Sequence, residues 1–234
     1  MRIICGVDGC KGGWVCIAED IDTGRVSWRQ YENATGVLYQ QPTPLVIAID
    51  IPIGLPEKGS RNCDLEARQL LGRPRACSIF PAPIRPVLAA TSYAEACQIG
   101  YAIEKRKLSQ QSWAILPKIK DIDTALRRDP ALRHWVREVH PEVCFYELAG
   151  KHPMKLSKKT KVGQTERLSL LRPHFGQPLE SALGQHRQVM SAPDDVLDAF
   201  AALWTAERIL AGQAKTLPAA PPQDAYGLRM EMVA

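Results

Sequence analysis

The sequence lacks the motifs of several large enzyme classes. It has no Cys-x-x-Cys pair, no His-Glu-x-x-His and no histidines four residues apart, which argues against the common zinc sites. It also lacks Gly-x-Ser-x-Gly and Gly-x-Gly-x-x-Gly, the marks of serine hydrolases and dinucleotide-binding enzymes. The glycine-rich segment 6–13 contains Lys11 but does not have the spacing of a P-loop. Catalysis, if there is any, must draw on other residues.

Long apolar runs and paired cysteines are also missing. The cysteines number seven, an odd count without regular spacing, which fits reduced thiols of a cytosolic protein better than a disulfide framework. No run approaches the roughly 18 apolar residues of a membrane span. The first residues lack the apolar core of a secretory signal. We therefore expect a cytoplasmic protein that does not enter a membrane.

The chain does have enough apolar residues for a sizeable core. Its 234 residues are 45% hydrophobic, which suits one large domain or one domain with an insertion. We expect a single domain over residues 1–217, with a polar, mainly helical insertion at about 57–130. Residues 218–234 are rich in proline and are expected to form a tail or an edge strand. The net charge of +5 is too small to indicate nucleic acid by itself.

The order of the expected elements indicates an α/β fold. Segments 2–8, 14–19 and 25–31 are short strands separated by glycine-containing turns, which is typical of an antiparallel meander. Segment 45–51 is continuously apolar, as in a strand buried on both faces. A further strand is expected at 135–140, and helices at 33–39, 66–71, 93–106, 119–128, 164–172 and 193–211. Together they predict a mixed sheet flanked by helices.

Acidic residues mark the ends of several of these elements. Asp8 and Asp50 each end an apolar strand, and Asp195 and Asp198 share one face of the last helix. Glu142 follows the strand at 135–140, close to His140. Carboxylate oxygens without a Cys/His cluster favour Mg²⁺ or Mn²⁺. We predict Asp8, Asp50, Asp195 and Asp198 as metal ligands, with Glu142 as a further catalytic acid and His140 as a group that positions water or a leaving group.

Each of these acids also has a structural interpretation. An aspartate after a strand is commonly a turn residue, and Asp194 and Asp195 could simply cap the last helix. Asp198 could pair with a buried arginine such as Arg61, Arg68 or Arg73. Glu142 could lie on the surface.

Basic residues gather in two segments, 105–128 and 151–167, which could contact nucleic acid. Trp113 and Tyr101 lie among them and could stack on bases. The alternative is that both segments are solvated faces and that the aromatic residues belong to the core.

Several motifs resemble those of the domain of unknown function 429 family, whose members are predicted ribonuclease-H-like nucleases. They include VDGCKGGW at 7–14, IDIPIGLP at 49–56, SIFP at 78–81, LPKI at 116–119, VHPEV at 139–143 and DDVLDA at 194–199. The resemblance implies a ribonuclease-H-like sheet with strand order 3-2-1-4-5, which places Asp8 beside Asp50. It also implies metal-ligand roles for the acids, with Asp8 central. Lys11, Arg61, Arg68, Arg73 and Lys118 match motif positions without a known role; with Lys158 and Lys159 we expect them to bind substrate.

Three functions remain open. The first is metal-dependent phosphodiester hydrolysis on nucleic acid, for which a homodimer would be plausible. The second is phosphotransfer to a small phosphorylated molecule, because the insertion could cap a small site. The third is a non-catalytic binding protein in which the acids are structural.

Overall fold

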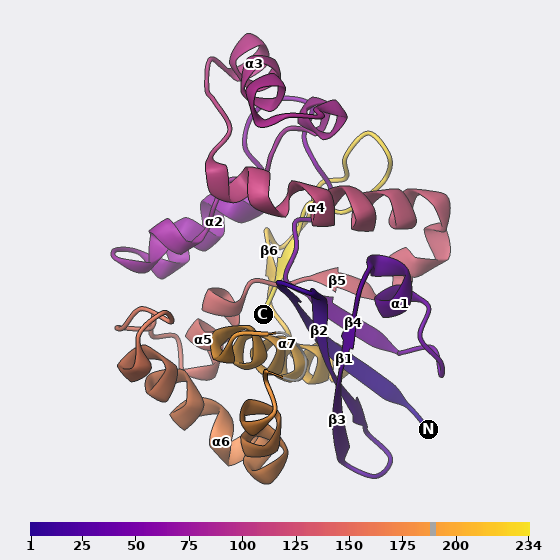
Figure 1. Ribbon diagram of the computed structural model, residues 1–234, viewed down its shortest axis with the longest axis vertical. Helices are drawn as coiled ribbons and strands as arrows, with labels where there is room; N and C mark the ends of the chain where they lie inside the picture. The colour runs from indigo at the N-terminus through magenta and orange to yellow at the C-terminus, as the bar shows by residue number, and fades with distance from the viewer. Residues whose placement is uncertain (188–190) are drawn as a thin grey trace.

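A computed structural model describes residues 1–187 and 191–234, and its centre is a five-stranded mixed sheet (Figure 1). The strands are β1 (Ile3–Cys10), β2 (Gly13–Asp20), β3 (Arg25–Tyr31), β4 (Val46–Ile49) and β5 (Val136–Glu138). Their order is β3-β2-β1-β4-β5, with antiparallel pairing from β1 to β3 and parallel pairing among β1, β4 and β5. The α/β fold and the strand order 3-2-1-4-5 are confirmed.

Side chains alternate between the two faces of the sheet, and each face carries its own core. Ile4 and Ala48 face a cluster built with α5 (Pro141–Leu148), α6 (Lys161–Gly184) and α7 (Pro193–Leu210). Cys5, Val7 and Ile49 face the opposite cluster, built with α1 (Ala34–Leu38) and α4 (Gln110–Arg128). Because the strand period is two, Asp8 and Asp50 are directed to the α7 side, like Ile4 and Ala48.

Most of the expected elements are present, but three differ from expectation. The helix expected at 119–128 begins at Gln110, and the helix expected at 164–172 runs from Lys161 to Gly184 with a non-helical backbone at Gly176. The helix α5 was not expected. Its first five residues are all buried, so it has no apolar stripe to reveal it. Glu142 therefore lies in the first turn of a helix rather than in a loop after a strand.

The chain between β4 and β5 is mainly helical, as expected for the insertion. It contains α2 (Asn62–Leu71), the 3₁₀ turns η1 (Arg75–Ser78) and η2 (Arg85–Ala89), α3 (Tyr93–Glu104) and α4. Figure 1 shows these elements projecting above the sheet, with α4 nearest to it. Within the described residues, no helix is both long and apolar enough to cross a membrane.

The proline-rich tail returns to the sheet instead of leaving it. β6 (Thr216–Leu217) pairs with β7 (Met232–Val233), and Val233 forms a parallel bridge with Val139, just beyond β5. Asp224 accepts a hydrogen bond from the backbone of Leu55 at 3.0 Å. The tail thus contributes to a separate two-stranded sheet and touches the end of β5 through one bridge.

Gly6 allows β1 and α7 to pack backbone against backbone. A Cβ atom at Gly6 would lie 2.1 Å from the nitrogen of Leu203 and 2.2 Å from the oxygen of Ala199. This contact brings the end of β1, and hence Asp8, close to α7. We expect Gly6→Ala to lower the free energy of unfolding by about 1–3 kcal/mol or more, because a packed core resists added volume.

Thermal or urea denaturation would measure this loss. Gly184→Ala is the matched control, because a Cβ there meets nothing within 4 Å and the backbone is helical. Equal stability of the two variants would contradict the close packing of β1 and α7.

Candidate functional site

Asp8 and Asp50 lie side by side at the ends of neighbouring parallel strands. The register pairs Val7 with Ile49, and the backbone nitrogen of Asp50 donates to the oxygen of Val7 at 2.9 Å. Asp8 is 7% exposed and Asp50 is partly buried. Burial raises the pKa of Asp8 well above its usual range, and the negative charges of Asp50 and Asp198 raise it further. Two such carboxylates need a neighbouring cation to stay ionised together.

Lys158 supplies that cation in this structure. Its ammonium pairs with Asp198, which is fully buried on α7. Burial opposes the charge of Lys158, but Asp198, Asp8 and Asp50 together outweigh it and raise its pKa. The partner of Asp198 is therefore Lys158 and not Arg61, Arg68 or Arg73. One ammonium thus pairs with the carboxylate on α7 and is close enough to those of Asp8 and Asp50 for their charges to raise its pKa.

Two oxygens beside this cluster are buried without a hydrogen-bond partner among the described residues. One is Oδ1 of Asp198, whose other oxygen binds Lys158. The second is Oε2 of Glu142, whose Oε1 accepts from Arg167 at 2.6 Å. Buried polar atoms are normally paired, so an unpaired oxygen beside a polar cavity indicates room for a further partner.

Asp194 and Asp195 mainly serve the start of α7. Oδ2 of Asp195 accepts from the backbone nitrogen of Ala192 at 2.8 Å, which is a helix-capping interaction. Asp194 is buried and pairs with Lys159 at 2.5 Å. Asp195 lies close enough to influence the pKa of Asp8. The structure thus favours the capping interpretation for Asp195, and it is not among the metal ligands that we propose below.

His140 is held in one orientation beside Glu142. Its Nδ1 accepts a hydrogen bond from the backbone nitrogen of Glu142 at 3.2 Å. A neutral ring with an accepting Nδ1 carries its proton on Nε2, so it can donate a hydrogen bond to a ligand from that side. Burial raises the pKa of the neighbouring Asp50, and His140 and Lys158 oppose that rise only in part.

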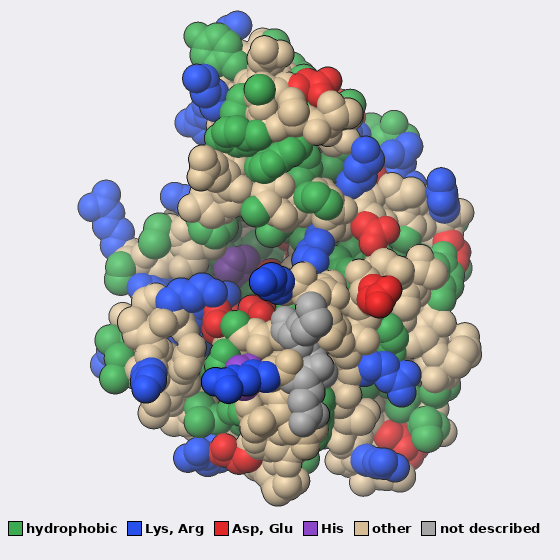
Figure 2. Space-filling view, viewed as in Figure 1, with side chains coloured by type: hydrophobic (Ala, Val, Ile, Leu, Met, Phe, Trp, Pro, Cys, Tyr) green, Lys and Arg blue, Asp and Glu red, His purple; other side chains and the backbone are tan. Residues whose placement is uncertain are grey.

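The site opens into a cavity of about 500 Å³. Asp8, Asp50, His140 and Glu142 line one side, and the insertion lines the other through α4 and residues 75–80. Figure 2 shows a hollow between the insertion and the body of the molecule, with acidic and histidine side chains in it and basic ones around it. Volume and mixed lining are typical of a binding site for a small ligand.

The structure brings only three of the expected substrate-binding residues to this cavity, Lys118, Lys158 and Lys159. The ammonium of Lys118 lies 5.2 Å from the ring centre of Trp14. Arg75 also lines the cavity, and the sequence offered no signal to separate it from the other basic residues of the insertion.

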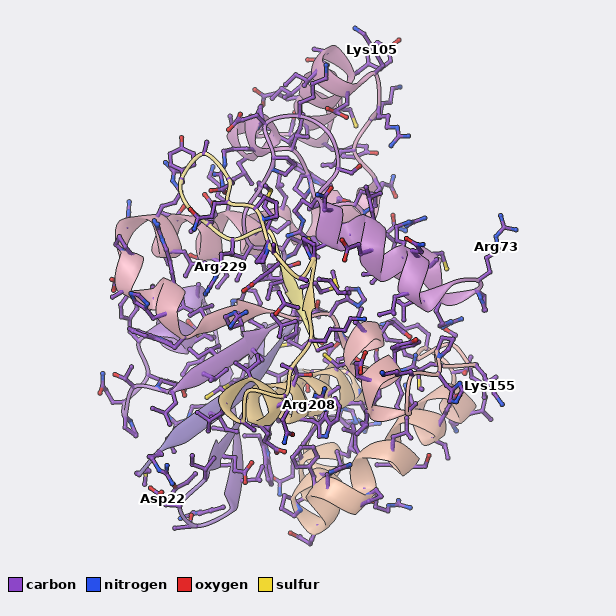
Figure 3. The ribbon with its side chains drawn as sticks, turned by 180° about the vertical axis from the view of Figure 1, so that it is seen from behind. Asp22, Arg73, Lys105, Lys155, Arg208 and Arg229 are labelled. Carbon is purple, nitrogen blue, oxygen red and sulfur yellow. The ribbon has the colours of Figure 1, made fainter. Side chains whose placement is uncertain are left out.

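The remaining four lie elsewhere, which corrects the expectation for them. Arg61 is 3% exposed and uses all five N–H groups on Asp64, Glu138 and the oxygen of Ile53, at 2.5–3.2 Å. Arg68 donates to the oxygen of Ile79 at 2.6 Å. Lys11 is exposed in the turn after β1, and Arg73 points into solvent (Figure 3).

The donor atoms of the cluster suit a hard divalent cation, although they are not arranged around one. Among residues 1–187 and 191–234, no three His, Cys, Asp or Glu side chains are grouped so that they could hold an ion as they stand. The cation that pairs with Asp198 is Lys158, and Oδ1 of the same carboxylate has no partner among the described residues. The oxygens themselves are the ligands that Mg²⁺ and Mn²⁺ prefer.

Comparison with known proteins identifies a family but no characterised relative. No curated protein and no solved structure matches the chain. The family model described as "Protein of unknown function (DUF429)" matches residues 6–223, nearly the whole chain. The protein therefore belongs to the DUF429 family.

Proposed function

We propose that this protein is a metal-dependent hydrolase that cleaves phosphodiester bonds in nucleic acid. The observation that carries the proposal is that Asp8, Asp50 and Lys158 line one cavity with further cations, and that Lys158 is paired there with the buried Asp198. Three carboxylates brought together from separate elements cost stability unless a cation compensates them. A structural protein gains nothing from such an arrangement, whereas an active site does.

Asp8, Asp50 and Asp198 are the residues that would hold Mg²⁺ or Mn²⁺. Such an ion supplies positive charge that polarises a phosphoryl oxygen and activates water. An ion that binds Asp198 only through its unpaired Oδ1 leaves Lys158 in place, whereas an ion that binds both oxygens must displace Lys158 from Oδ2. Lys158 lies in the 149–160 segment before α6 and is one-third exposed at its side chain, so it can turn towards a substrate phosphate instead.

The other residues of the cavity would orient the substrate. Lys118 and Lys159 provide charges for phosphate oxygens, and the unused Nε2–H of His140 can donate a hydrogen bond to a leaving oxygen. Glu142, held by Arg167, offers its free oxygen Oε2 to a water molecule. These roles place the acids on one side of the reacting phosphate and the cations around it.

We expect Asp8→Asn to weaken the binding of Mn²⁺ at least tenfold and to abolish cleavage, because Asp8 is central to the cluster. Calorimetric titration of wild type and variant with Mn²⁺ and Mg²⁺ would measure the first effect. Cleavage assays on single-stranded, duplex and branched oligonucleotides would measure the second. Asp22→Asn is the matched control, since Asp22 is exposed and distant from the site (Figure 3).

The Lys158–Asp198 pair also favours a second candidate, a non-catalytic binding protein in which Lys158 permanently neutralises the acids. The same titration separates the two. If wild type binds neither ion at millimolar concentration, with or without an oligonucleotide, the hydrolase proposal fails and the binding protein is favoured.

A further inference from the structure

We propose that the cavity receives one unpaired nucleotide, with its base against Phe80 and its phosphate towards the acids, so that the substrate is single-stranded rather than duplex. This inference rests on the proposed function, because it names the substrate of the same site. Three observations support it: the insertion covers Asp8 and Asp50, the ring of Phe80 is exposed in the cavity, and basic side chains line the same cavity.

The insertion covers the acids. Residues 75–80 and α4 both line the cavity that contains Asp8 and Asp50, on the side away from the sheet. The volume of about 500 Å³ is in the range that holds one small ligand. A paired base cannot enter such a space while it remains stacked in a duplex, and enzymes with enclosed sites therefore take single strands or extruded nucleotides.

Phe80 offers a surface for the base. It lines the cavity and is 46% exposed, although large apolar side chains are usually buried. Ile115 and Pro52 add apolar surface, and the amide of Gln111 can form hydrogen bonds with the edge of a base. Stacking on an aromatic ring is the common way of holding unpaired bases without strong sequence preference.

Cations lie around this surface where the phosphates of a strand would pass. Arg75, Lys118 and Lys159 all line the same cavity. Nε of Arg75 is buried without a hydrogen-bond partner among the described residues, and its Nη1 makes one long contact of 3.4 Å to the oxygen of Leu156. An arginine with unused donors beside a cavity is suited to phosphate. The cavity thus combines an apolar part for a base with a charged part for phosphate.

The test measures binding of a fluorescein-labelled 12-nucleotide strand by fluorescence anisotropy in Mg²⁺, with the same strand annealed to its complement as comparison. Gel analysis after each titration verifies that the strand is intact. We expect the single strand to bind at least tenfold more tightly than the duplex. Phe80→Ala should weaken single-strand binding about 5- to 150-fold, and Phe80→Trp should retain it. Tyr101, a stacking candidate in the sequence, is exposed on α3 and does not line this cavity, so Tyr101→Ala should have no effect.

Tighter binding of the duplex, or equal binding by wild type and Phe80→Ala, would overturn the inference. Competition with dAMP tells whether the cavity prefers a free nucleotide or a nucleotide within a strand. If dAMP displaces the labelled strand at concentrations similar to those of the unlabelled strand, the ligand is a free nucleotide. If dAMP does so only at far higher concentrations, the ligand is a strand. Titration of Phe80→Ala with Mn²⁺ should match wild type. A variant that binds Mn²⁺ normally but shows no Phe80 effect on strand binding refutes this inference alone and leaves the proposed hydrolase intact.

Discussion

Replacing Lys158 by methionine should make the protein less stable without divalent ions and should tighten its binding of Mn²⁺ about tenfold. In the structure, the ammonium of Lys158 is the cation that compensates Asp198, Asp8 and Asp50. An ion that binds both oxygens of Asp198 has to displace Lys158 from Oδ2, so part of its binding energy is spent on breaking that pair. Methionine retains the apolar stem and removes the competing charge. A tenfold change in the dissociation constant for Mn²⁺ corresponds to about 1.4 kcal/mol of binding free energy, which is less than the cost expected for breaking the ion pair between Lys158 and Asp198.

The loss of stability without metal is expected to be about 1–3 kcal/mol. Removing one partner of a fully buried ion pair costs about 3–5 kcal/mol, but the side chain of Lys158 is 33% exposed, so solvent reduces the effect. Addition of Mn²⁺ should then raise the melting temperature of Lys158→Met by more than that of wild type, because at a given ion concentration a tighter ligand stabilises the folded state more.

Lys159→Met is the matched control for this experiment. Lys159 is the next residue and pairs with Asp194, but its side chain is 70% exposed and Asp194 belongs to the start of α7. We expect little change in metal affinity, although the loss of a partner for Asp194 lowers stability to some extent. If Lys158→Met binds Mn²⁺ no more tightly than Lys159→Met, Lys158 does not compete with the ion, and the ion does not bind the oxygen of Asp198 that Lys158 holds.

Replacing Arg61 by methionine should lower the free energy of unfolding by about 3–5 kcal/mol, the largest effect that we expect for a single substitution. Arg61 holds Glu138 at 2.7 Å and Asp64 at 2.5 Å, and all three side chains are almost fully buried. Without the guanidinium, two carboxylates remain in the interior with no cation opposite them. Denaturation by urea would measure the loss, since its slope also reveals whether the variant still unfolds cooperatively.

Two further variants test whether the loss of stability in Arg61→Met comes from buried carboxylates left without a cation. Arg68→Met removes another arginine from the same helix, but Arg68 is only partly buried and makes one hydrogen bond to a backbone oxygen, so the loss should be much smaller. Adding Glu138→Gln to Arg61→Met should restore part of the stability, because the orphaned charge disappears while an amide remains for the backbone of Ile53. A double variant less stable than the single one would contradict the proposed origin of the effect.

These predictions also separate two kinds of buried charge in the same protein. The network of Arg61 is complete within itself and joins α2 to β5, so it stabilises the attachment of the insertion to the sheet. The cluster around Lys158 is incomplete, since Oδ1 of Asp198 has no partner among the described residues. A completed network is a structural element, whereas an incomplete one beside a cavity is suited to a ligand. Because of this contrast, we assign Arg61 a structural role and not a role in substrate binding.

Much of the fold could be predicted from the sequence because it depends on local patterns. The alternation in 14–19 and the continuous apolar run at 45–51 predicted strands that the structure contains as β2 and β4. Positions of acids at strand ends were equally visible, and the resemblance supplied the strand order that makes Asp8 and Asp50 neighbours. Helix α5 was not predictable in this way, because a segment buried on all sides shows no period.

The sequence by itself determined which residues end the strands, which face of the sheet they take, and that Asp198 must lie among apolar neighbours on its helix. Only the tertiary structure decided the partner of each charge. Asp198 binds Lys158, 40 residues away, and Glu138 binds Arg61, 77 residues away. The sequence does not distinguish the arginines and lysines that could pair with a given acid, because an ion pair between distant residues leaves no periodic pattern in the sequence. The path of the insertion and of the segment before α6 decides which cation reaches which acid, and that path follows from long-range packing.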